Sequence, residues 1–147
     1  MIELYASLPQ TSASQPAEPG SLEANPFLWK AFGPVRLTIG TEEVYESDSA
    51  AVPITIIELA NCIWRCCSTG QATTLSMNLE PVVDFVPEGA TTSIIDTGQA
   101  NEVLARIPND TLLDYRKTIL LKAKAENPGL FELMAPLLFG PVPGAPE

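Results

Sequence analysis

The sequence contains no histidine and only three cysteines among its 147 residues. Without an imidazole, the chain lacks the general base of Ser-His-Asp and Cys-His centres and the common nitrogen ligand of zinc sites. The phosphate-binding patterns G-x-x-x-x-G-K-[ST] and G-x-G-x-x-G and the serine motifs G-x-S-x-G and S-x-x-K are also missing. We therefore expect a protein that is not an enzyme and that has no cofactor and no metal site.

Basic residues are also few, with eight Lys and Arg against 18 Asp and Glu, a formal net charge of −10 and a pI of about 4.3. Because proteins that bind nucleic acid present a basic surface, we expect no nucleic-acid partner. No window approaches 18 uninterrupted apolar residues, and the first residues lack the basic region of a signal peptide. The sequence thus predicts a cytoplasmic protein that does not enter a membrane.

The length predicts one folded domain, and an apolar content of 46% indicates a globular chain. Residues 1–26 combine a short segment, Ile2–Leu8, with a Pro/Ser-rich linker. The short segment is either an added strand or loose chain. Residues 27–139 form the predicted single domain, and the proline-rich residues 140–147 are expected to be a disordered tail.

Alternating apolar and polar residues predict antiparallel strands. Val35–Ile39 and Glu42–Glu46 form a predicted hairpin around Gly40. A meander of further strands follows over residues 72–79, 81–87, 91–96 and 102–107.

A helix predicted over Ile54–Ser68 begins after Pro53, a residue that fits the first helical turn. Its polar residues occupy one narrow stripe, so we expect a mostly buried helix. Further helices are predicted over residues 111–126 and 130–138. The order of elements predicts an α+β fold, in which an antiparallel sheet of about five or six strands is packed on one face by the central apolar helix and a C-terminal helix.

Three polar side chains of the central helix, Glu58, Asn61 and Arg65, have two interpretations. They are either the solvent edge of a packed helix or a small polar site that faces a partner. The cysteines of the same helix, Cys62, Cys66 and Cys67, are odd in number and do not form a C-x-x-C pair. We expect them to be reduced core side chains.

Acidic charge is concentrated in the sheet half of the chain, where residues 37–105 carry ten acidic residues and one basic residue, Arg65. Such a field accelerates association with a basic protein, although acid-rich loops also serve solubility alone. Neighbouring carboxylates of a strand point to opposite faces, which disfavours acid–base catalysis or cation binding. The candidate partner-binding residues are Glu42, Glu43, Glu46, Asp48, Asp84 and Glu88.

The succession of the Val35–Ile39 strand, the acidic hairpin, the Pro-started helix Ile54–Cys67 and the Val82–Val86 strand resembles small immunity proteins of bacterial polymorphic-toxin systems, including contact-dependent and type VI immunity proteins. The resemblance covers about residues 33–125 as a pattern and includes no signature motif. It implies a non-enzymatic protein that binds and occludes a cognate toxin domain, and the acidic half would suit a basic toxin such as a nuclease.

Three other functions remain open. A phage or mobile-element inhibitor would present carboxylates in the manner of nucleic-acid phosphates. A structural or accessory subunit would form a homodimer through the apolar segment Leu130–Leu138. An enzyme that acts through carboxylates alone is the last alternative.

Overall fold

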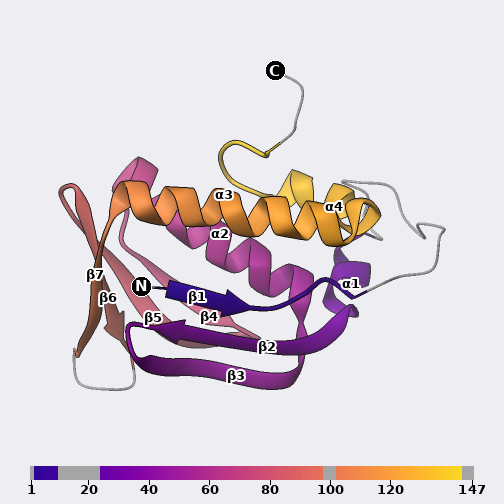
Figure 1. The fold of residues 1–147 in the computed structure, drawn as a ribbon, viewed down its shortest axis with the longest axis horizontal. Coiled ribbons are helices and arrows are strands. Elements are labelled where there is room, and N and C mark those ends of the chain that lie inside the picture. The colour runs from indigo at the N-terminus through magenta and orange to yellow at the C-terminus, as the bar shows by residue number, and fades with distance from the viewer. Residues whose placement is uncertain (1, 10–23, 98–101, 144–147) are drawn as a thin grey trace.

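The computed structural model describes residues 2–9, 24–97 and 102–143 (Figure 1). The predicted α+β fold class is confirmed, since helices accompany a three-stranded and a four-stranded antiparallel sheet. We call the three-stranded sheet, in the order β1-β2-β3, sheet A, and the four-stranded sheet, in the order β4-β5-β6-β7, sheet B. Sheet A consists of β1 (Ile2–Tyr5), β2 (Phe32–Ile39) and β3 (Glu42–Ala51). Sheet B consists of β4 (Thr73–Met77), β5 (Glu80–Glu88), β6 (Thr91–Asp96) and β7 (Val103–Pro108).

The N-terminal segment is docked as a strand. β1 pairs with β2 in antiparallel register, with Ile2 opposite Ile39 and Tyr5 opposite Arg36. The backbone N–H of Leu4 also donates a hydrogen bond of 2.6 Å to the hydroxyl of Tyr115. The sequence alone did not decide between a strand and loose chain, because four residues are too few to show a clear alternation of apolar and polar side chains.

The described strands form two sheets. α2 follows β3, the last strand of sheet A, and leads to β4, the first strand of sheet B. The sheets approach each other where Gly40, in the β2–β3 turn, lies against β7. A Cβ on Gly40 would lie 2.8 Å from the carbonyl oxygen of Leu104, and the φ of Gly40 is 63°. Only glycine satisfies both constraints without movement of the backbone.

The strand predicted over residues 72–79 ends earlier, at Met77. Asn78 and Leu79 have φ values of 54° and 69° and form a two-residue hairpin turn. Asparagine tolerates this left-handed region, but leucine rarely adopts it. The prediction placed the end of the strand two residues too late, because Leu79 continues the alternation of Leu75 and Met77 although it lies in the turn.

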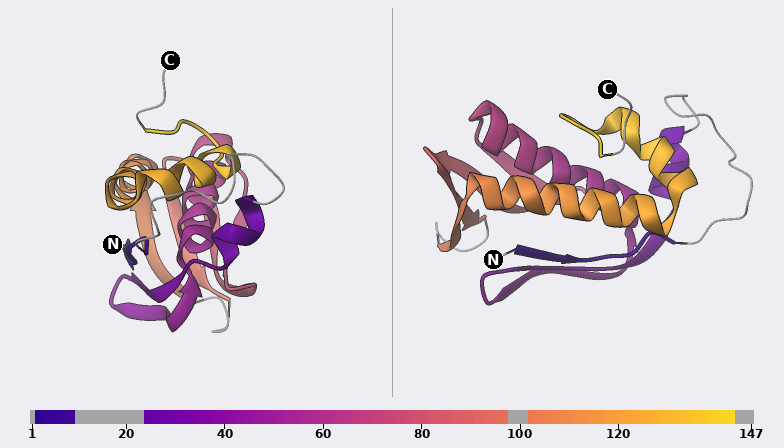
Figure 2. Two further views of the ribbon diagram at one scale, coloured as in Figure 1. Left: turned by 90° about the vertical axis from the view of Figure 1, so that its right-hand side faces the viewer. Right: turned by 45° about the horizontal axis from the view of Figure 1, so that its top comes forward.

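The helices are α1 (Ala24–Trp29), α2 (Val52–Thr69), α3 (Asn109–Glu126) and α4 (Pro128–Met134), and a 3₁₀ turn, η1 (Ala135–Leu137), follows α4. The buried character predicted for the central helix is confirmed. α2 ends at Gly70, which has a φ of 73°. Figures 1 and 2 show α2 and α3 side by side, with sheet A beneath them and sheet B toward one end.

The helix predicted over residues 130–138 divides into α4 and η1, because Pro136 cannot donate the hydrogen bond that would continue an α-helix. α1 was not predicted, since the Pro/Ser-rich composition of residues 9–26 masked its start. Most of that predicted linker, and residues 144–147 of the predicted tail, lie outside the described residues. The predicted domain boundaries therefore stay predictions.

Candidate functional site

The outer face of sheet A carries two neighbouring cross-strand rows of polar side chains. Glu3, Thr38 and Glu43 stand opposite one another in the first row, and Tyr5, Arg36 and Glu46 in the second. Residues in register share a face, and the inner face is occupied by the buried side chains of Val35, Leu37 and Ile39. We call these two outward rows the acidic face, because three carboxylates surround one guanidinium.

The single cation of the acidic face is already paired. Arg36 lies 3.7 Å from a carboxylate oxygen of Glu43, and its guanidinium carbon lies 4.3 Å from the centre of the Tyr5 ring. The hydroxyl of Tyr5 donates a hydrogen bond to Glu3. This bond, followed by the negative charge of Glu3, raises the pKa of Tyr5 above its usual value. Tyr5 is therefore a neutral donor fixed on the face.

A groove of about 500 Å³ opens at the border of the acidic face, where β1 ends. Beyond Tyr5 the chain leaves sheet A and is held instead at the C-terminal end of α3. There Glu126 accepts a hydrogen bond of 3.2 Å from the backbone N–H of Leu8, and the Asn127 amide donates one of 2.8 Å to the carbonyl of Pro9. The N-terminal half of β2 is left without a neighbour on that side, and the groove forms in the gap.

The lining of the groove combines an apolar floor with charged walls. Leu4, Ala6 and Pro34 contribute apolar surface, whereas Val35, which also borders the groove, is almost completely buried. The basic wall residue Lys122 is 3.2 Å from Glu126 and donates to the carbonyl of Ala6.

On the opposite wall, Glu46 and Asp48 are exposed, and neither has a hydrogen bond or ion pair with another described residue. The basic wall residues, Lys122 and Arg36, are both neutralised within the chain. The unbalanced charge of the groove is therefore negative.

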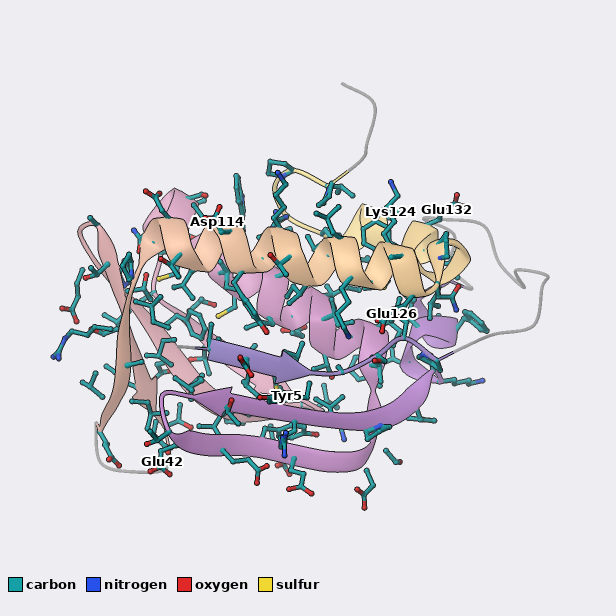
Figure 3. The ribbon with its side chains drawn as sticks, in the orientation of Figure 1. Tyr5, Glu42, Asp114, Lys124, Glu126 and Glu132 are labelled. Atoms are coloured by element: carbon teal, nitrogen blue, oxygen red, sulfur yellow. The ribbon has the colours of Figure 1, made fainter. Side chains whose placement is uncertain are left out.

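The six acidic residues predicted to bind a partner do not all meet at one place. Glu43 lies on the acidic face, Glu46 lies on both the face and the groove, and Asp48 lines the groove. Glu42 lies at the turn of the β2–β3 hairpin, away from the labelled Tyr5 (Figure 3).

The last two predicted residues belong to sheet B and have partners within it. Asp84 accepts a hydrogen bond of 2.6 Å from Thr74, and Glu88 accepts one from Ser93. Whether any of the six binds a partner stays a prediction.

Sequence reasoning missed four residues of the site: Glu3, Tyr5, Arg36 and Lys122. Their only available signal was the outward position of Arg36 in the alternating Val35–Ile39 strand. Glu3 and Tyr5 became site residues only through the pairing of β1, and Lys122 comes from a distant helix.

The polar stripe of α2 has a structural role that neither predicted interpretation fully describes. Glu58, Asn61 and Arg65 line a small cavity of about 150 Å³ together with Phe139. Burial raises the pKa of Glu58, and the nearby Arg65 opposes this shift. Asn61 and Arg65 also hold the C-terminal segment of the chain.

The three cysteines lie as predicted in or beside the core, with Cys62 and Cys66 buried and Cys67 half-buried. The sulfur atoms of Cys66 and Cys67 lie 3.4 Å and 3.7 Å from the hydroxyl oxygen of Thr92. Burial raises the pKa of Cys67 to about 11 and raises the pKa of Cys62 strongly. These thiols are therefore poor nucleophiles at neutral pH.

The segment Leu130–Leu138, predicted to join two copies, turns most of its apolar side chains into the chain's own core. Leu130, Phe131, Leu133, Met134 and Leu138 are buried, whereas Leu137 is 37% exposed. A homodimer through this segment stays a prediction, with little apolar surface to support it.

Within the described ranges, no group of three or more Cys, Asp or Glu side chains is placed to hold a metal ion. No described helix is long and apolar enough to cross a bilayer. Comparison with protein-family models, curated proteins and solved structures finds no match for this chain. The geometry of the site is therefore the only basis for a functional proposal.

Proposed function

We propose that this chain is a non-enzymatic protein-binding domain that holds a basic partner against the acidic face and its groove. In its more specific form, the proposal is a cytoplasmic immunity protein that binds and occludes a cognate toxin domain. The observation that carries the proposal is the charge balance of the groove, in which Glu46 and Asp48 have no partner among the described residues while Arg36 and Lys122 do.

The groove suits a lysine or arginine side chain of the partner. Its apolar floor, which includes Leu4 and Pro34, can cover an aliphatic stem, while Glu46 and Asp48 receive the cationic end. Rim carboxylates of this kind increase the association rate and the specificity of a complex.

A pull-down from the native host tests the proposal. The tagged chain is incubated with lysate, washed at low and then at high salt, and the bound proteins are identified by mass spectrometry. The proposal predicts a stoichiometric basic protein whose retention falls as salt rises. A double variant, Glu46→Gln with Asp48→Asn, should lose this protein at lower salt than the parent chain.

The matched control neutralises two exposed acids on the helical side, Asp114→Asn with Glu132→Gln (Figure 3). It removes the same charge from the molecule but leaves the groove intact. Equal loss of the partner in both double variants would show that net charge, and not the groove, holds the complex. Capture of this chain alone as a dimer would instead favour the homo-oligomeric alternative.

A further inference from the structure

The C-terminal segment, residues 137–142, crosses α2 and α3, and we call it the strap (Figures 1 and 2). Asn61 of α2 binds its backbone twice: the amide donates to the carbonyl of Leu137 at 3.0 Å, and the amide oxygen accepts from the N–H of Phe139 at 2.8 Å. A paired donor and acceptor on one side chain recognise an extended backbone whatever its side chains. The strap therefore occupies a built peptide site.

Arg116 of α3 lies beneath the strap and is a buried cation without an ion-pair partner among the described residues, although its guanidinium carbon lies 5.2 Å from the centre of the Trp64 ring. Its exposed fraction is 4%, and no carboxylate of the described residues lies within ion-pair distance. Its Nη2 donates a hydrogen bond to the carbonyl oxygen of Phe139, whereas its Nε has no hydrogen-bond partner among the described residues. Nε and Nη2 share one edge of the guanidinium, and this edge binds carboxylates through two parallel hydrogen bonds. The Phe139 carbonyl has one oxygen and accepts from only one of these two N–H donors.

The next residue of the strap imposes a second constraint. Gly140 has a φ of 80°, and a Cβ on it would lie 2.4 Å from a ring atom of Trp64. The position after Phe139 therefore accepts glycine and no larger residue. A chain that ended at the equivalent of Phe139 would have no residue to place there.

We propose that this site on α2 and α3 recognises the free C-terminal carboxylate of another protein, and that the strap fills it in cis. The carboxylate would replace the Phe139 carbonyl and engage both Nε and Nη2 of Arg116. This inference is independent of the acidic face and does not rest on the proposed function.

The strap also indicates which C-terminal residues fit. The side chain of Leu138 is buried, so the penultimate residue is a medium-sized apolar one. The guanidinium carbon of Arg65 lies 4.6 Å from the centre of the Phe139 ring, so the last residue is aromatic. The ligand class is a chain that ends in Leu-Phe or a close relative, with a free carboxylate.

The test variant is Gly140→Ala in the full chain. Its Cβ would clash with the ring of Trp64, and this clash should displace the strap and leave the site empty. The control is Gly89→Ala, which places alanine at a similar positive φ of 70° with nothing within 4 Å. The probe is a fluorescent peptide with the sequence of residues 135–139, Ala-Pro-Leu-Leu-Phe, made with a free C-terminal carboxylate or with a C-terminal amide. Binding is measured by fluorescence anisotropy, and emission of Trp64 in a Trp29→Phe background reports strap release.

We expect the free-acid peptide to bind the Gly140→Ala variant about tenfold more tightly than the amide, and more tightly than it binds the Gly89→Ala control. Adding Arg116→Lys to the Gly140→Ala variant keeps the positive charge but removes the pair of parallel N–H donors. This change should reduce the preference for the free-acid peptide. If Trp64 emission shows the strap still bound, Phe139→Ala is added to release it. Equal affinity for acid and amide, or no binding of either to a released site, would overturn the proposal.

Discussion

At the scale of single residues, the charges of this chain differ in whether the fold supplies them with a partner. Arg36 is paired with Glu43, and Lys122 is paired with Glu126. The Arg36–Glu43 pair is about half exposed and the Lys122–Glu126 pair is partly exposed, so both contribute little to stability, and their main effect is to leave Glu46 and Asp48 as the unbalanced charges of the groove. The number of these acids is evident from the sequence, but which of them have a partner is not.

The thiols provide a prediction at this scale. Because burial raises the pKa of Cys67 to about 11 and that of Cys62 strongly, we expect all three cysteines to react slowly with a disulfide reagent at pH 8 in the native protein. In guanidinium chloride the same assay should count three fast thiols. One native thiol reacting as fast as free cysteine would contradict the buried placement.

Glu58 provides a second prediction. Glu58 is exposed at the surface of α2, but partial desolvation raises its pKa in the folded state above the usual value of 4.5, so its ionised form slightly opposes folding at neutral pH. Glu58→Gln should therefore raise the melting temperature at pH 7. The advantage should shrink as pH falls through the raised pKa and vanish below the unfolded value, where both states are protonated. Thermal melts at pH 7 and pH 4 check this, and an equal gain at both would contradict it.

At the scale of elements, periodicity located most of the described helices and strands but not their contacts. The polar stripe of α2 was visible in the sequence, yet its bonds to Leu137 and Phe139 join residues more than seventy positions apart. The end of β4 was misplaced because Leu79 occupies a left-handed turn position that leucine seldom takes. Local pattern carries no information about either feature.

The junction of α3 and α4 yields the prediction at this scale. Asn127 accepts a hydrogen bond of 3.1 Å from the N–H of Leu130, which caps α4, and its amide holds Pro9. Asn127→Ala should lower the free energy of unfolding by about 1–2 kcal/mol. Asn127→Ser keeps a capping oxygen without adding a buried charge but lacks the amide donor to Pro9, so it should lose less. Urea unfolding compares the two, and an unchanged midpoint for alanine would contradict the capping role.

At the scale of the whole molecule, the sequence established the α+β class and the uneven distribution of charge. The groove was beyond its reach, because it forms where β1 leaves sheet A and Glu126 and Asn127 capture the chain. The acidic face likewise joins residues from all three strands of sheet A, and only the register of these strands brings them together.

The most direct test of the account is the association rate of the captured partner, measured by stopped flow at low and high ionic strength. At low salt, neutralising Glu46 and Asp48 should slow association about tenfold, while the Asp114/Glu132 control should change it little. The difference between the two variants should diminish at high salt. Equal rates for both variants, or a parent rate indifferent to salt, would contradict an acidic groove that binds a basic partner.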